Sequence, residues 1–162
     1  MAKEKDKLKK LKEDYLEIQK KYKLPSFEKL NEDFQIEKVA EVNTDHLIRE
    51  VRKFMADKFS NYLRFIEMLL NPVNVPMFVF YFVKSLNAED KTRLSESYKK
   101  LAKIEIDLIE ADVQFSEQKE AEFIKESYKI WQEIKEDIIK MIDSVKNNWD
   151  TKIKPNDKGY FG

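Results

Sequence analysis

The sequence contains very little glycine and no cysteine. Its only two glycines, Gly159 and Gly162, lie in the last four residues. Tight hairpins and phosphate-binding loops depend on glycine for backbone conformations with positive φ. The rest of the chain therefore has almost no route to a multi-hairpin β fold, a P-loop or a Rossmann dinucleotide site. The lack of cysteine excludes disulfides, thiol catalysis and cysteine-ligated metals.

Long apolar runs are also absent. The longest, residues 75–83, has nine residues including one proline, whereas a membrane-spanning helix needs about twenty. Residues 1–12 are charged throughout and contain no apolar segment typical of a secretory signal. The sequence therefore predicts a cytoplasmic protein that does not enter a membrane.

Charge is balanced overall but unevenly distributed. The chain has 31 basic and 31 acidic residues, yet residues 1–23 carry nine lysines against five Asp or Glu. Residues 24–145 carry 18 basic against 24 acidic residues. A nucleic-acid-binding domain is usually basic as a whole, so this distribution is only a weak indication of nucleic-acid binding.

Apolar residues recur at the 3-4 spacing of amphipathic helices. Ser26, Asn87 and Ser116 are suited to cap helices that follow them, and the short connection 113–116 predicts that the two helices it joins are antiparallel neighbours. Residues 34–42 fit either a helical turn or an extended connector. The predicted helices are 2–23, 27–33, 45–70, 76–86, 88–112 and 117–149.

These elements predict an all-α protein, an up-and-down helical bundle of about four long amphipathic helices with one or two short ones. We expect a single domain over residues 1–149, from which the helix at 1–23 is able to protrude. Residues 150–162, with their proline and glycine, are predicted to form a flexible C-terminal tail.

Two carboxylates lie on or beside the apolar stripe predicted for helix 88–112. They are Glu105 and Asp112, and Ile104 and Ile109 are predicted to lie alongside the same stripe. Such acids are typical of metal sites in helical bundles, but a di-iron bundle also needs paired Glu-x-x-His motifs. The chain has one histidine, His46, predicted to be exposed or capping. We therefore predict no catalytic, cofactor or metal residue, and a metal-dependent hydrolase stays an alternative.

Two other groups of residues allow more than one interpretation. The acids of the last helix, including Glu117 and Glu120, alternate with lysines and are predicted to form a solvated, ion-paired face. The apolar segment 72–83 would be a docking surface if it were exposed. Its composition favours burial instead, as a helix over 76–86 in the centre of the core.

The first helix combines a narrow apolar seam with many lysines. Such a seam is typical of a coiled-coil contact, within the chain or between chains, while the lysines suit contacts with phosphates. We predict that this helix contacts a partner. The candidate partner-binding residues are Lys7, Lys9, Lys10, Lys12, Leu8, Leu11 and Tyr15.

Four short segments resemble uncharacterised all-helical proteins of archaea. They are Leu24-Pro25-Ser26-Phe27-Glu28, Phe34-Gln35-Ile36-Glu37, Pro76-Met77-Phe78 and Val83-Lys84-Ser85-Leu86. The resemblance covers about residues 20–145 and implies a helical fold without implying a function.

These observations favour a non-enzymatic helical bundle that serves as a protein-interaction or scaffold module. Its partner is predicted to be another protein or a second copy of the chain, docked on the first or the last long helix. The alternative is an RNA- or ribosome-associated accessory protein that uses the basic N-terminal helix.

Overall fold

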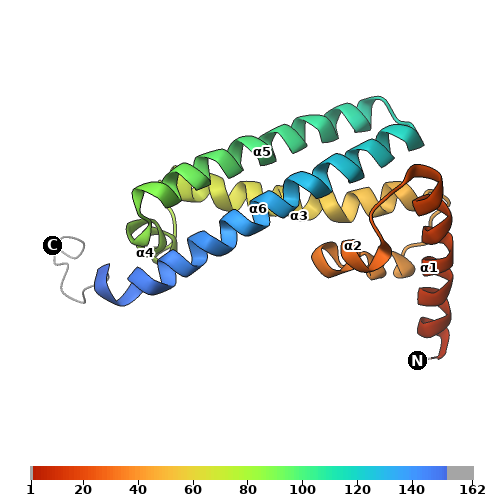
Figure 1. Cartoon of the computed structure of the whole chain (residues 1–162), viewed down its shortest axis with the longest axis horizontal. Helices are drawn as coiled ribbons and strands as arrows, with labels where there is room; N and C mark the ends of the chain where they lie inside the picture. The colour runs from red at the N-terminus through yellow and green to blue at the C-terminus, as the bar shows by residue number, and fades with distance from the viewer. Residues whose placement is uncertain (1, 153–162) are drawn as a thin grey trace. The chain divides into compact units, whose positions relative to one another are not determined.

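The computed structural model describes residues 2–152, and within that range it contains helices and no strand, so the all-α fold is confirmed (Figure 1). The segment 34–42, left open by the sequence, contains a 3₁₀ helix. The C-terminal tail prediction falls mainly on residues 153–162, outside the described part, while residues 150–152 belong to the last helix. The elements are α1 (Ala2–Tyr22), α2 (Phe27–Phe34), η1 (Ile36–Glu41), α3 (Leu47–Leu70), α4 (Met77–Ser85), α5 (Ala88–Val113) and α6 (Glu117–Lys152).

The described residues form two compact units. Unit 1 comprises residues 2–61 and 103–131, and unit 2 comprises residues 62–102 and 132–152. Helices α3, α5 and α6 each contribute one part to each unit. Within each unit the parts of α5 and α6 lie antiparallel to each other, as predicted (Figure 1).

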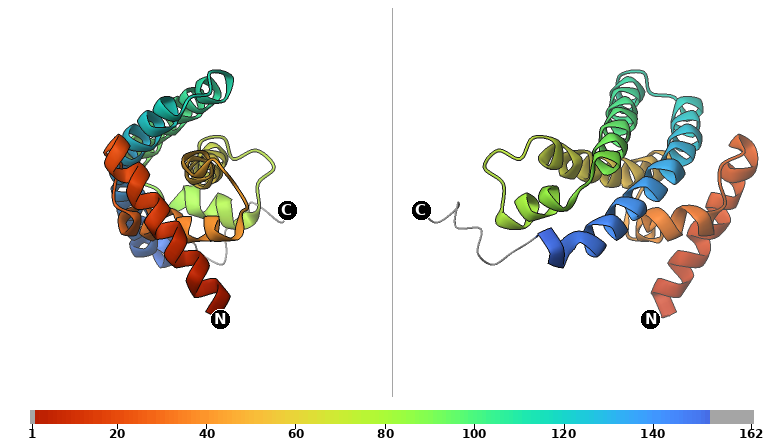
Figure 2. Two further views of the ribbon diagram at one scale, coloured as in Figure 1. Left: turned by 90° about the vertical axis from the view of Figure 1, so that its right-hand side faces the viewer. Right: turned by 60° about the vertical axis from the view of Figure 1, so that its left-hand side comes forward.

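In unit 1, α1 packs on α2 and η1 and runs across the direction of α3 (Figure 2). Tyr15 fixes this contact, because its buried phenol donates a hydrogen bond of 2.7 Å to the carbonyl of Pro25. Its ring also meets the edge of Phe27 at 5.6 Å. Burial raises the pKa of the Tyr15 hydroxyl, and nearby Glu28 adds to that effect.

Helices in unit 1 end without glycine. The backbone N–H of Leu24 donates to the carbonyl of Gln19, which closes α1 with Lys23 at φ 56°. Gln35 takes the same left-handed conformation at the end of α2. Such positions favour glycine, because a Cβ atom is crowded there. The near-absence of glycine therefore places side-chain-bearing residues in a strained conformation.

The centre of unit 1 is aromatic. Phe34 and Phe59 each lie 5.9 Å from the ring of Trp131, and 5.4 Å from one another. Phe123 extends this cluster, 6.5 Å from Phe59. Tilted and edge-on rings at these separations attract each other beyond their burial of apolar area, so α2, α3 and α6 are joined at this point.

The N-terminus of α5, in unit 2, is capped by two reciprocal hydrogen bonds. The backbone N–H of Asp90 donates to the Asn87 side chain at 2.8 Å, and the N–H of Asn87 donates to the Asp90 carboxylate at 3.1 Å. This capping box confirms Asn87 as the predicted cap. Ser26 and Ser116 likewise accept from the N–H groups of Lys29 and Lys119 at the starts of α2 and α6.

Two predictions of burial are wrong. Within 76–86 only Val79, Phe82, Ser85 and Leu86 are buried, whereas Phe78 is 57 % exposed. A nine-residue helix buries one face only, so α4 leaves apolar side chains outside. Ile109 is also exposed, because the stripe that α5 buries runs through Leu101, Ile104 and Ala111 and places Ile109 on another face.

Candidate interaction surfaces

The predicted partner-binding residues of α1 divide into two groups. Lys7, Lys9, Lys10 and Lys12 are exposed, whereas Leu11 and Tyr15 are buried within unit 1 and Leu8 is half-buried. Most of the apolar seam therefore contacts this chain itself. The four lysines remain on the surface, and partner binding through them stays a prediction.

Beside these lysines lies a groove of about 350 Å³ between α1 and the chain from η1 to the start of α3. Its α1 wall includes Lys7, Lys10 and Asp14. Its other wall is formed by residues 39–44 and by Leu47. The walls carry both signs of charge and short apolar side chains, so the groove has no marked preference for one type of ligand.

An arginine is buried between two carboxylates in unit 1. Arg52 of α3 donates to Glu120 through Nε at 2.7 Å and through Nη2 at 3.3 Å. The same Nη2 donates to Asp112 at 2.7 Å. Burial alone would lower the pKa of the Arg52 guanidinium, but Glu120 and Asp112 together raise it. Arg52 therefore stays charged and ties α3 to both α5 and α6.

This network corrects the predicted solvated face of α6, because Glu120 is 0 % exposed. Glu117 is exposed as predicted, and accepts hydrogen bonds from Tyr22 and Lys21 of α1. These two hydrogen bonds lower the pKa of Glu117, and the one from Tyr22 has the larger effect.

Glu105 and Asp112 do not converge. Glu105 accepts a hydrogen bond of 3.0 Å from Ser60, while Asp112 is held by Arg52. In the described part of the chain no three His, Asp or Glu side chains lie so that they could hold a metal ion. The hydrolase alternative therefore stays a prediction without a carboxylate cluster to support it.

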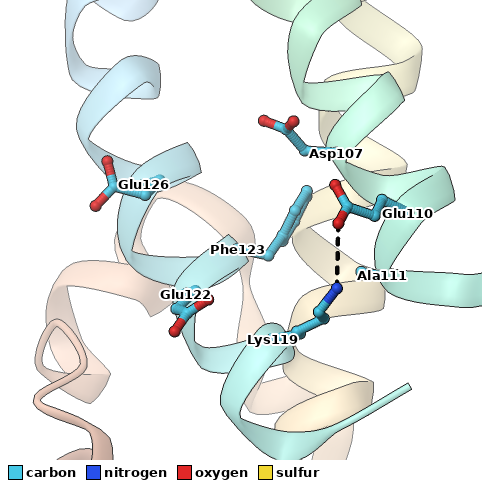
Figure 3. Close-up of a pocket in the computed structure, with 7 residues that line it drawn as sticks. All are labelled: Asp107, Glu110, Ala111, Lys119, Glu122, Phe123 and Glu126. Atoms are coloured by element: carbon cyan, nitrogen blue, oxygen red, sulfur yellow. Dashed lines mark hydrogen bonds and ion pairs between the residues drawn. The ribbon is translucent and has the colours of Figure 1, made fainter. Parts of the chain in front are cut away.

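Between α5 and α6 of unit 1 lies a shallow acidic pocket of about 190 Å³ (Figure 3). Asp107 and Glu110 border it from α5, and Glu122 and Glu126 from α6. Lys119 forms an ion pair of 3.1 Å with Glu110, across the gap between the helices. Lys103 and Lys129 pair with Asp107 and Glu126 from outside the lining, so the rim keeps a small net negative charge.

The outer face of α5 carries an apolar stripe. Ile106, Ile109 and Val113 follow each other at spacings of three and four residues, which places them on one side of the helix. Their exposed fractions are 65 %, 59 % and 78 %. We call these three residues the α5 stripe.

Phe115 follows the α5 stripe in the connection to α6. It is exposed, and the guanidinium carbon of Arg49 lies 4.9 Å from the centre of its ring. His46, exposed as predicted, meets the same ring at 6.0 Å. The connection is thus anchored to the start of α3 through Phe115.

Unit 2 has an apolar groove of its own, of about 390 Å³. Its walls come from α4 and from the end of α6, and Phe78, Phe82 and Trp149 form most of them with Ile142 and Val145. The Phe78 ring contacts Phe82 at 6.0 Å and Trp149 at 6.2 Å. These contacts keep the exposed Phe78 in a defined position.

No family model, curated protein or solved structure matches the chain, so the resemblance to archaeal helical proteins stays a prediction. Among the described residues we find no helical stretch with the length and apolar character that crossing a bilayer requires.

Proposed function

We propose that this protein is a protein-interaction module that binds its partner through the α5 stripe. The observation that carries the proposal is the exposure of Ile106, Ile109 and Val113 on one face of a long helix. Single exposed apolar residues are ordinary, but neighbouring ones on a regular face are typical of contact surfaces. Their spacing is that of helices that bind other helices.

The helix that carries the stripe is held on both sides. Towards α3, Glu105 accepts from Ser60 and Asp112 from Arg52. Towards α6, Glu110 pairs with Lys119. A surface that is already ordered loses little conformational freedom when a partner binds, which supports its use as a rigid docking face.

The test compares the proteins that co-purify with three forms of the chain. The double substitution Ile106→Ser with Ile109→Ser removes the stripe, and Ile139→Ser is the control, because Ile139 is an isoleucine of α6 in unit 2 that is 50 % exposed. We expect a partner that is retained by the wild type and the control and lost from the double variant. Identical sets of partners in all three would contradict the proposal.

A second candidate is nucleic-acid binding by α1. The exposure of Lys7, Lys9, Lys10 and Lys12 supports it, since phosphate contacts need lysines that reach solvent. Reversing these four charges to Glu should weaken RNA binding by at least about tenfold and flatten its salt dependence. The control is reversal of Lys91 and Lys99, exposed lysines of α5, which should leave RNA binding unchanged. RNA affinity that is equal in the two variants would remove this candidate.

A homodimer through α1 or α6 stays a prediction. Leu11 and Tyr15 are occupied within unit 1, so the seam of α1 has little apolar surface left for a second copy.

A further inference from the structure

We infer that the partner of the α5 stripe presents a basic amphipathic helix, with lysine or arginine on both sides of its apolar face. This inference rests on the proposed function and names the chemical class of the partner. It follows from the charges that border the stripe on its two sides.

The side facing α3 is acidic. Glu105 and Asp112 lie there, about two helical turns apart along α5. Glu105 is half-buried and accepts a hydrogen bond from a neutral hydroxyl, that of Ser60. Asp112 shares the charge of Arg52 with the fully buried Glu120. Glu105, Asp112 and Glu120 therefore stand against two arginines, Arg52 and Arg49, the second of which packs on Phe115. This side keeps a small net negative charge.

The side facing α6 is acidic as well. Glu110 and Asp107 border the stripe there, and Glu122 and Glu126 stand across the shallow pocket (Figure 3). Lys119 offsets Glu110 and Lys103 offsets Asp107, each at 3.1 Å, and Lys129 offsets Glu126 at 3.3 Å. Glu122 accepts a hydrogen bond from the neutral amide of Gln118, so its charge is not offset by a lysine in this way. Over residues 103–131 as a whole, eight Asp or Glu stand against four Lys. Each side of the stripe therefore keeps a small net negative charge.

A second copy of the chain is a poor occupant of this surface. If two α5 stripes met about a twofold axis, the acidic borders of one would face those of the other. Like charges brought together at an interface weaken binding by several kcal/mol. The chain's own basic helix, α1, has its apolar residues Leu11 and Tyr15 buried against unit 1. A separate basic helix meets neither obstacle.

The experiment uses the full chain and designed helical peptides of about three heptads, with leucine at the a and d positions. One peptide carries lysine at e and g, a second glutamate and a third glutamine. A scrambled lysine peptide of equal composition, without the apolar stripe, measures attraction by charge alone. Fluorescence anisotropy gives the dissociation constants at low and high salt.

We expect the lysine peptide to bind at least about tenfold more tightly than the glutamate and scrambled peptides, with the difference shrinking at high salt because exposed charges are screened. The Ile106→Ser, Ile109→Ser double variant should lose this binding, and Ile139→Ser should keep it. Glu110→Gln should weaken it by about threefold. The control is Glu133→Gln, since Glu133 forms a similar pair with Lys100 in unit 2.

The outcomes separate the inference from the proposed function. If the glutamate or glutamine peptide binds as tightly as the lysine peptide, and the stripe variant abolishes that binding, the docking face stands and the basic partner is wrong. Binding that is insensitive to the stripe variant, or no binding by any peptide, would overturn both. A dimer in light scattering that the stripe variant dissociates would identify a second copy as the occupant and overturn the inference alone.

Discussion

Among the described residues, each unit contains a carboxylate that is 0 % exposed, Glu120 in unit 1 and Asp90 in unit 2. The two units hold these charges in different ways. In unit 1, Glu120 is bound by Arg52, a cation that is itself buried. In unit 2, Asp90 accepts from the Ser144 hydroxyl at 2.6 Å and from the backbone of Asn87, while partly exposed Arg93 lies 3.4 Å away. Unit 1 thus balances one buried charge with another, whereas unit 2 spreads the stabilisation over neutral donors. The contrast predicts that removing the arginine beside the buried carboxylate lowers the free energy of unfolding far more in unit 1 than in unit 2.

The largest effect is expected from removing the arginine that lies beside the buried carboxylate of each unit, Arg52 or Arg93. Arg52→Met leaves Glu120 buried without its cation, which should lower the free energy of unfolding by about 3–5 kcal/mol. Arg93→Met should lower it by at most about 1 kcal/mol, because neutral donors still hold Asp90. Urea unfolding measures both. Equal losses would show that the two units do not differ as described.

A double variant sharpens this prediction. Arg52→Met combined with Glu120→Leu replaces the buried pair with apolar side chains, a change that is often neutral or stabilising. We expect it to recover most of the stability that Arg52→Met loses. A double variant as unstable as the single one would mean that packing around Arg52, rather than its charge, is decisive.

The next effect concerns the hydroxyl donors. Ser144→Ala removes a donor from the buried carboxylate of Asp90 and should lower stability by about 1–3 kcal/mol. Ser60→Ala is the matched control in unit 1, because water can replace the Ser60 hydroxyl at half-buried Glu105. This substitution should lower the free energy of unfolding by less than about 1 kcal/mol. A Ser60 variant that is the less stable of the two would contradict the comparison.

A smaller effect, of opposite sign, is expected at the left-handed residues. Lys23 in unit 1 and Asn74 in unit 2 have φ of 56° and 55°. Lysine is strained in this conformation whereas asparagine tolerates it. Lys23→Gly should therefore stabilise the chain by about 0.5–1 kcal/mol, and Asn74→Gly should change little. Thermal unfolding measures the difference, and a loss of stability in Lys23→Gly would disprove the strain.

The smallest effect belongs to an exposed carboxylate of unit 1. The pKa of Glu117 is lowered from its ordinary value of 4.5 by hydrogen bonds from Tyr22 and Lys21. A lowered pKa in the folded chain means that this contact stabilises above pH 4.5 and that the gain disappears as pH falls through the folded pKa. Glu117→Gln should be slightly less stable than wild type at pH 7 and equal to it once acid has protonated Glu117 in the folded chain. A difference that persists in acid would exclude this origin.

The fold was largely predictable because its signals are local. Periodicity and the caps at Ser26, Asn87 and Ser116 indicated each helix within a few residues of its observed ends. The left-handed turns at Lys23 and Gln35 were not foreseen. They depend on packing around residues that lack the glycine usually found at such positions.

The candidate surface was less predictable, because it depends on how far each helix is rotated about its axis. The sequence predicts Ile109 near the core, from a stripe that runs close to the observed one. It predicts Glu120 in solvent because this residue lies among charged residues, although it stands four residues before buried Ile124. Two signals in the sequence point to the ion pair between Arg52 and Glu120. Glu120 lies on the N-terminal extension of the buried stripe of α6, and Arg52 lies four residues after buried Ile48.

The chain also carries one tryptophan in each unit. Trp131 lies in the aromatic centre of unit 1, and Trp149 contacts Phe78 in unit 2. The fluorescence of each tryptophan therefore reports on its own unit. Trp149→Phe leaves Trp131 as the fluorophore of unit 1, and Trp131→Phe leaves Trp149 as the fluorophore of unit 2. If the unfolding transitions of the two variants, followed by fluorescence, coincide, the two units unfold cooperatively. If they differ, α3, α5 and α6 must each melt in two halves.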